Sequence, residues 1–280
     1  MMLRTIGSRR RWGSWLLTGG LAPVALLWLA PLYLMGVFAT LPDYAIFSPD
    51  LPLTPGGNFL ENLAFLDGTA NFGRAMLNSI GIATVSAALS LLLTSMAGYA
   101  FARFKFVGKQ VAFSLLVATL TVPYAVLIVP QYVLVARDLA LSNTWIAVIV
   151  PPLCHSIGVL FMRQTFLSLP QELLDAARID GAREGRIFFS IALPLVRPSM
   201  AALAIILFLA SWNNYLWPLL VATESGARTA PVALGSLIGL NVVPWGALMV
   251  GATLLTLPMI VVFIFLQRYF VAGITAGAVK

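Results

Sequence analysis

Charged residues are scarce in this chain. Asp, Glu, Lys and Arg make up 10% of the 280 residues, whereas 60% are hydrophobic and the mean hydropathy is +0.94. A soluble domain carries about 25% charged residues. The chain has too little polar surface to cover itself in water, so its composition predicts a membrane protein. The net charge of +7 does not indicate a nucleic-acid partner, because the basic residues are spread among loops that flank apolar runs.

Residues that build covalent or metal centres are nearly absent. The single cysteine, Cys154, excludes an internal disulfide framework and a metal site of several cysteines, and we expect the single histidine, His155, to pack in its hydrophobic run. No acidic or basic residue lies near the middle of a long apolar run, which disfavours an ion-coupled carrier. The sequence also lacks the G-x-x-x-x-G-K-[ST] phosphate loop. We therefore expect no catalytic residue, no metal site and no cofactor in this chain.

Long apolar runs are abundant, and they predict an all-α membrane protein with six transmembrane helices. The predicted spans cover residues 15–40, 72–101, 111–136, 144–162, 199–221 and 245–267. The basic start, 1–14, also fits a signal peptide, but the run after it is long and lacks a clear cleavage site, so we expect an uncleaved first span. The apolar segment 231–243 is short, and we interpret it as re-entrant or interfacial.

The longest polar connection, 41–71, is rich in Pro and Gly and contains no Lys or Arg. Pro and Gly at this density predict an exposed loop without regular helix. Two roles remain open for it: a plain surface loop, or a docking surface for an extracytoplasmic partner.

The distribution of basic residues predicts the topology. Fourteen of the 17 Lys and Arg residues lie in 1–14, the 103–109 loop, the stretch 163–198 and the C-terminal end, which is Arg268 with the tail 269–280. The other three are Arg74, Arg137 and Arg228. Because positive charge marks the cytoplasmic side, both termini and the stretch 163–198 are predicted to be cytoplasmic, with 41–71 outside and 72–268 forming a core of five helices.

The second half of the chain has one long polar segment, residues 169–198, which we call the polar loop. Pro170 suits the first turn of a helix, and Glu172 and Asp175 favour the positive end of that helix. Leu173, Ala176, Ala177 and Asp180 give this helix a face with small residues, where another backbone could approach. Gly181 is expected to end the helix. Ile187, Phe188 and Ile191 fit the apolar stripe of a second short helix that ends at Leu193 and Pro194.

This loop resembles the cytoplasmic signature of ABC importer permeases, which reads Glu-Ala-Ala, then Gly, then a hydrophobic-x-Leu-Pro ending. Here Asp175-Ala176-Ala177, Gly181 and Ile191–Pro194 stand at those positions, with Asp replacing Glu. The wider pattern is similar to the carbohydrate-uptake branch, the maltose-type permeases. The matching segments are Glu172-Leu173, Ile179–Ala182, Leu193–Leu195, Ser211–Pro218, Gly98–Phe104 and Asn78-Ser79.

The resemblance implies the type I permease fold, with the polar loop as a cytoplasmic coupling helix that docks on an ATP-binding subunit. It implies coupling roles for Glu172, Asp175, Ala176, Ala177, Asp180, Gly181, Ala182, Leu193 and Pro194; Arg178 and Arg183 either adjust the docking or have no role. The implied partners are a second permease, two ATP-binding subunits that hold the ATP and Mg²⁺, an extracytoplasmic solute-binding protein, a sugar and the bacterial inner membrane.

The substrate pathway is less specific in the sequence. Asn213, Asn214 and Tyr215 combine amides and an aromatic ring in the predicted fifth span, and Asn78 and Gln131 are further candidates. The alternative for Asn213–Tyr215 is interhelical hydrogen bonding or a local helix break before Pro218. Glycerol-3-phosphate or a phosphodiester is an alternative substrate, and an ATP-independent secondary carrier or channel is the alternative class.

Overall fold

The protein is helical wherever the computed structural model describes it. The structure describes the backbone of residues 6–278 and the side chains of 19–21, 23–265 and 267, and no strand occurs in this range. The chain divides into two compact units, one of residues 1–70 and 236–256 and one of 71–235 and 257–280.

The first unit contains α1 (Ile6–Phe38), α2 (Asp43–Ile46), α3 (Phe59–Ala70) and the start of α15 (Trp245–Ala278). Side-chain hydrogen bonds hold its connections. The Asn62 amide donates to the carbonyls of Ala39 and Leu41 at 3.0 and 2.9 Å, and the Asp43 carboxylate accepts from the Gly246 N–H at 2.7 Å.

The prediction that Pro and Gly exclude regular helix from 41–71 is wrong. The short helix α2 lies in its first half and the twelve-residue helix α3 fills its second half. The reason is local composition. The prolines of this stretch end at Pro55, and residues 58–70 hold a single glycine, Gly68, so nothing prevents a helix there.

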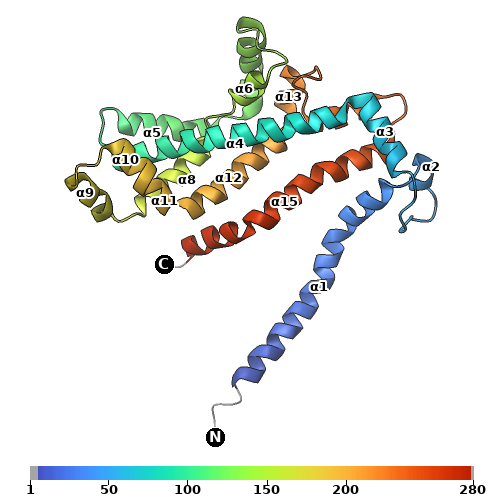
Figure 1. Cartoon of the computed structure of the whole chain (residues 1–280), viewed down its shortest axis with the longest axis horizontal. Coiled ribbons are helices and arrows are strands. Elements are labelled where there is room, and N and C mark those ends of the chain that lie inside the picture. The colour runs from blue at the N-terminus through green and yellow to red at the C-terminus, as the bar shows by residue number, and fades with distance from the viewer. Residues whose placement is uncertain (1–5, 279–280) are drawn as a thin grey trace. The chain divides into compact units, whose positions relative to one another are not determined.

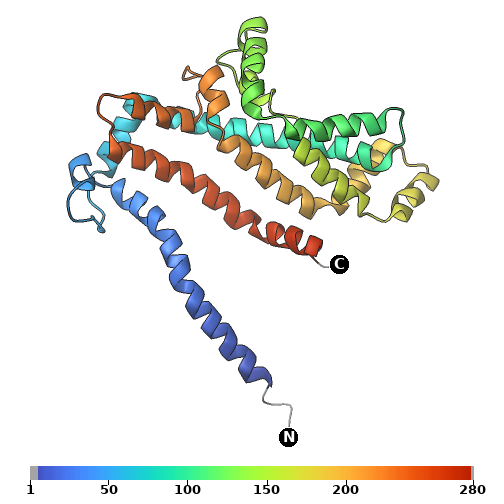
Figure 2. The same cartoon turned by 180° about the vertical axis from the view of Figure 1, so that it is seen from behind.

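The second unit is built around α4 (Phe72–Arg103), with α8 (Ser156–Leu167) and α12 (Arg197–Trp212) packed along it (Figures 1 and 2). The backbones of α4 and α8 approach closely. A Cβ placed on Gly98 would lie 2.7 Å from Cβ of Met162 and 2.8 Å from the backbone N of Arg163. Glycine at such a contact is typical of helix pairs in membranes.

The remaining elements of this unit are short. Apart from the end of α15, they are α5 (Lys109–Ala118), η1 (Thr119–Thr121), α6 (Tyr124–Tyr132), the π-helical η2 (Val133–Asp138), α7 (Trp145–Ile149), α9 (Gln171–Ile179), α10 (Glu184–Ile187), the π-helical η3 (Phe188–Ala192), α11 (Leu193–Leu195), α13 (Leu216–Val221) and α14 (Ala230–Ser236), which is followed by η4 (Leu237–Gly239) of the first unit. The last two occupy the segment that we interpreted as re-entrant or interfacial, and that interpretation stays a prediction.

Three helices of the described range are long and apolar enough to cross a bilayer without interruption: 19–38, 72–103 and 245–265. Two bent pairs bring the number to five if each pair is one span. These are 109–121 with 124–138, bent by 100°, and 184–195 with 197–212, bent by 84°. The assignment of six crossings stays a prediction.

Three predicted spans are not single helices, and prolines or asparagines mark the breaks. The 111–136 run breaks before Pro123, and the 144–162 run breaks at Pro151 and Pro152, which separate α7 from α8. Proline lacks the N–H that an α-helix needs and disfavours the helical conformation of the residue before it. The 199–221 run breaks at Asn213–Tyr215.

Candidate functional site

The first helix of the polar loop, α9, has defined ends. Pro170 precedes it rather than occupying its first turn, so the predicted start is wrong by one residue. At the other end Gly181 has φ = +80°, its N–H donates to the Arg178 carbonyl, and the Ala182 N–H donates to the Ala177 carbonyl, both at 3.0 Å. This pair of bonds is the Schellman ending, which places glycine in the left-handed conformation. The prediction that Gly181 ends the helix is confirmed.

One face of α9 packs into the second unit. Leu174 is fully buried and Ala177 is 8% exposed, in a cluster with Ile187, Phe188 and Tyr99. The Tyr99 ring lies 5.2 Å from that of Phe166 and 5.1 Å from that of Phe188. The predicted small-residue face is therefore divided, because Ala177 points inward and Ala176 is exposed.

The opposite face of α9 is exposed and carries both carboxylates and apolar side chains. Glu172, Asp175, Ala176 and Asp180 lie on the surface, and the Ile179 side chain is 86% exposed. A cavity of about 370 Å³ opens beside it, lined among others by Asp180, Gly181, Ala182, Arg186 and Ile191. An exposed isoleucine flanked by carboxylates is a surface that a protein partner can cover.

Hydrogen bonds and ion pairs connect α9 to the end of α4 in what we call the polar ring. Its members are Tyr99, Arg103, Gln171, Asp175, Arg178 and Glu184. Arg103 donates to the Gln171 side chain, and Gln171 donates to Asp175 at 3.0 Å. Arg178 donates to Asp175 at 2.6 Å and to Glu184 at 2.7 Å. The Tyr99 hydroxyl donates to Glu184 at 3.4 Å, which returns the ring to α4.

Arg103 fixes the start of the loop as well. Its guanidinium donates to the carbonyls of Phe166, near the end of α8, and Leu169, where the polar loop begins. The planar guanidinium presents several donors at once, so one side chain joins α4, α8 and α9. Figure 1 shows α9 and α10 gathered at this end of α4.

The electrostatics of the polar ring favour its charged state. Hydrogen bonds from Gln171 and then from Arg178 lower the pKa of the Asp175 carboxyl below its ordinary value. The hydrogen bond to Glu184, followed by that to Asp175, raises the pKa of the Arg178 guanidinium. Both shifts favour the charged forms of Asp175 and Arg178.

The second helix of the polar loop begins at Glu184, with Ile187 and Phe188 buried and Ile191 half-buried, as its stripe predicts. Its predicted end is wrong. The helix passes through half-buried Leu193 and Pro194 as a π-helical turn followed by α11, and bends by 84° only after Leu195. Because Pro194 cannot donate to a residue four positions back, the helix widens ahead of it.

The predicted pathway residues lie in different elements. Asn213 and Tyr215 are exposed in the break between α12 and α13, and Asn214 Oδ1 accepts from the Trp217 N–H at 3.4 Å. Gln131 lies in α6, and its buried Oε1 has no hydrogen-bond partner among the described residues.

Asn78 is 1% exposed, and its amide donates to the carbonyls of Ser225 and Arg228 at 3.0 Å each. Its donors are therefore used within the protein. Among the described residues no hydrogen bond joins Asn78, Gln131 and the 213–215 break, and their role in a pathway stays a prediction.

Sequence reasoning missed four members of the polar ring as functional residues: Tyr99, Arg103, Gln171 and Glu184. The sequence did contain a signal for Tyr99 and Arg103, because both lie in Gly98–Phe104, one of the segments that carry the family resemblance. Its contact with the polar loop needed the structure. No group of three or more His, Cys, Asp or Glu side chains that could hold a metal ion occurs in the described part of the chain.

The described residues form a helical protein in which an exposed amphipathic helix is fastened to the end of a helix long and apolar enough to cross a membrane. A solved structure has this fold: that of a bacterial ABC transporter involved in the import of the acidic polysaccharide alginate, with a TM-score of 0.77 at 22% identity, covering 94% of this chain and 98% of that one. The predicted all-α permease fold is confirmed. The family model of the binding-protein-dependent transport system inner membrane component matches residues 90–276, and the chain belongs to this family.

Curated relatives cover nearly the whole chain. The arabinooligosaccharides transport system permease protein AraQ of Halalkalibacterium halodurans is 40% identical, over 95% of this chain and 96% of its own length. The lactose transport system permease protein LacG of Rhizobium radiobacter is 36% identical, over 81% and 83%. The sn-glycerol-3-phosphate transport system permease protein UgpE of Yersinia pestis is 34% identical, over 89% and 91%.

Proposed function

We propose that this chain is the permease subunit of an ATP-driven importer of a sugar. It forms the translocation pathway with a second permease and receives its solute from an extracytoplasmic binding protein. Both termini and the polar loop lie in the cytoplasm, where α9 docks on one of two ATP-binding subunits. Those subunits hold the ATP and Mg²⁺, and this chain catalyses no reaction.

The observation that carries the proposal is the polar loop itself. Its helix α9 exposes Ile179 and a row of carboxylates outward, while the polar ring joins one flank of the helix to α4. A movement imposed on α9 by a docked partner would therefore be transmitted to α4, a helix long enough to cross the membrane. A secondary carrier or channel has no need for this arrangement.

A sugar fits better than a phosphate ester. Two relatives with large coverage are named for arabinooligosaccharides and lactose. The candidate pathway residues Asn78, Gln131, Asn213, Asn214 and Tyr215 are all uncharged, which suits a neutral, hydroxyl-rich solute better than an anion. Glycerol-3-phosphate stays the second candidate because of the similarity to UgpE.

The coupling role is tested by replacing Gly181 with arginine. Its φ of +80° strains a side chain by about 1–2 kcal/mol, and a Cβ there meets no atom within 4 Å, so the arginine projects outward from the end of α9. We expect normal insertion but at least a tenfold loss of solute-stimulated ATPase activity and uptake in proteoliposomes, equivalent to about 1.4 kcal/mol.

Gly108→Arg is the matched control, since Gly108 has φ = +79° with equally open space but lies outside the polar loop. The proposal is overturned if Gly181→Arg copurifies with the ATP-binding subunits and transports at the normal rate. Uptake that persists in proteoliposomes without those subunits would instead identify a carrier or channel.

A further inference from the structure

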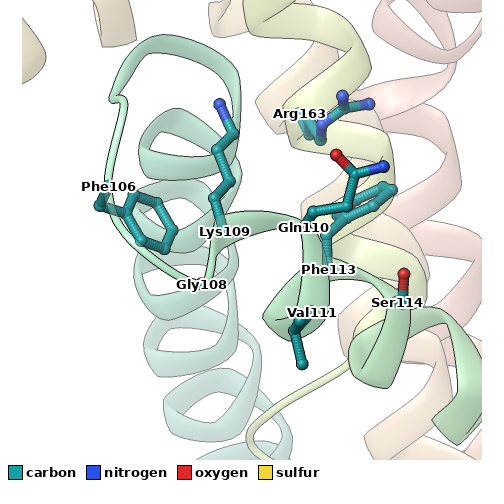
Figure 3. Close-up of a pocket in the computed structure, with 8 residues that line it drawn as sticks. All are labelled: Phe106, Gly108, Lys109, Gln110, Val111, Phe113, Ser114 and Arg163. Carbon is teal, nitrogen blue, oxygen red and sulfur yellow. The ribbon is translucent and has the colours of Figure 1, made fainter.

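A second site lies beside the start of α5, apart from the face of α9 that we assign to docking. A cavity of about 650 Å³ opens there (Figure 3). Its polar lining consists of Lys109, Gln110, Ser114 and Arg163, and the ring of Phe113 forms part of its wall. None of these side chains carries negative charge, so the cavity favours an anion.

The Arg163 guanidinium is held in place by an aromatic ring, but its charge has no acidic partner among the described residues. Its guanidinium carbon lies 4.4 Å from the centroid of the Phe113 ring, a cation–π contact that holds the planar group in place. Its Nε is buried, with no hydrogen-bond partner among the described residues. The described residues provide no acidic partner for it, and a buried guanidinium donor without an acceptor is costly.

Lys109 contributes a second cation. Its Nζ donates to the Phe104 carbonyl at 2.8 Å, which leaves its other N–H groups without an acceptor among the described residues. Lys109 is also the first residue of α5, whose first turn contains no acid. The positive end of the α5 dipole therefore adds to the two side-chain cations.

The surroundings of the cavity are apolar. Val107 is fully exposed, and Val111 and Leu115, one turn apart on α5, are 65% and 64% exposed. Two cations beside such an apolar strip match a molecule with a phosphate at one end and hydrocarbon at the other. A small soluble anion would leave the strip uncovered.

We propose that this cavity binds the phosphate of an anionic phospholipid between Lys109 and Arg163, with an acyl chain along Val111 and Leu115. The assignment of this site to the inner leaflet rests on the proposed function, in which the 103–109 loop is cytoplasmic. The chemistry of the site does not depend on that orientation.

The test uses the transporter purified with its partner subunits, delipidated and titrated with phosphatidylglycerol, with bound lipid counted by native mass spectrometry. We expect Lys109→Gln to weaken phosphatidylglycerol binding about fivefold, and Lys109→Gln with Arg163→Gln about 25-fold, at about 1 kcal/mol for each cation. Lys105→Gln is the matched control: it removes the same charge from the same loop, but Lys105 is exposed and does not line the cavity. It should change binding less than twofold.

Each other outcome overturns the proposal. Equal losses for Lys105→Gln and Lys109→Gln would indicate a diffuse charge effect, and equal binding of phosphatidylcholine would exclude recognition of the anion. Displacement by equimolar inorganic phosphate would indicate a soluble-anion site. If these variants lose the second permease while their lipid binding is unchanged, the cavity is instead an interface with another protein.

Gly181→Arg, measured in the same preparation, separates this proposal from the proposed function. It should retain normal lipid affinity while coupling is lost. If coupling is instead unaffected, the function fails while the lipid site stands or falls on its own titration.

Discussion

The two ends of α4 are held in different ways. At its Arg103 end the polar ring uses charged side chains that are partly exposed: 31% for Arg178, 51% for Asp175 and 42% for Glu184. At its Asn78 end neutral side chains bond to backbone. The Asn78 amide donates to the carbonyls of Ser225 and Arg228, and the Ser79 hydroxyl accepts from the Ala230 N–H at 2.7 Å.

This difference concerns how easily each end can rearrange. Exposed ion pairs contribute about 0–1 kcal/mol each, so the polar ring can exchange partners at little cost. A buried amide whose carbonyl partners would be left unpaired costs about 1–3 kcal/mol to remove. We infer that the Asn78 end is fixed and the Arg103 end is adjustable, which is consistent with the proposed docking of a partner on α9.

The largest expected effect tests whether only the side-chain bonds at the Arg103 end can rearrange, while the packing of the helix backbones there is fixed. Gly98→Leu would place atoms within 3 Å of Cβ of Met162 and the backbone N of Arg163, and backbone cannot move aside as a side chain can. We expect a loss of about 3 kcal/mol or more in unfolding free energy, measured as the thermal unfolding of the detergent-solubilised transporter.

Gly185→Leu is its control, because a Cβ at Gly185 meets no atom within 4 Å. If both variants unfold at the same temperature, the close approach of α4 and α8 is not a structural requirement. The whole Arg103 end would then be adjustable, including its helix packing.

The next effect concerns the Asn78 end. Asn78→Ala leaves the carbonyls of Ser225 and Arg228 unpaired, and we expect the unfolding free energy to fall by about 2 kcal/mol. The same substitution at exposed Asn213, whose side chain forms no hydrogen bond among the described residues, should cost less than about 0.5 kcal/mol. Equal losses would remove the contrast between the two ends of α4.

Asn78 also shows how far the sequence predicted the site. The resemblance identified the Asn78-Ser79 pair, the polar loop and Gly181, because each needs a particular residue at a particular place. It could not reveal that the Asn78 amide bonds to residues about 150 positions away. The length of an apolar run predicted α4, and residues typical of helix ends together with an apolar stripe predicted both helices of the polar loop. The polar ring instead depends on the tertiary contact between Tyr99 and Glu184, which no local pattern records.

The breaks in the spans were partly predictable. Pro123, Pro151 and Pro152 were visible within apolar runs, but proline in a membrane helix either kinks or breaks it, and the neighbouring packing decides which. The reverse error occurred in 41–71, where the density of Pro and Gly near its middle concealed the uninterrupted composition of α3.

Glu184→Gln is expected to reduce stability less than the preceding variants do, and to affect coupling more than stability. The variant removes the charge paired with Arg178 at 2.7 Å while keeping the size of the side chain. We expect less than about 1 kcal/mol of lost stability, but a severalfold loss of solute-stimulated ATPase activity, because one of the links between α9 and α4 is weakened.

Arg137→Gln supplies the control, since it breaks an exposed ion pair with Asp138 that lies outside the polar loop. A double-mutant cycle of Glu184→Gln with Arg178→Gln should show that the two substitutions are not additive in coupling. Additive effects, or an equal loss from Arg137→Gln, would mean that the polar ring does not transmit movement.

The smallest effect concerns the acid range of the polar ring. Asp175 has a pKa below its ordinary value of 3.8, first through the hydrogen bond from Gln171 and then through Arg178. A carboxyl with a depressed pKa stabilises the folded state above that ordinary value, and the stabilisation is lost as pH falls through the lower, folded-state pKa.

Gln171→Ala should therefore raise the pKa of Asp175, so that the carboxylate is lost at a higher pH, with no change at pH 7. A ¹³C NMR titration of Asp-labelled transporter measures this, with Asp175→Asn assigning the signal and Gln164→Ala, an exposed glutamine on α8, as control. An unchanged Asp175 titration in Gln171→Ala would show that Gln171 is not part of the polar ring in solution, and that Arg103 is joined to the polar loop by the Leu169 carbonyl alone.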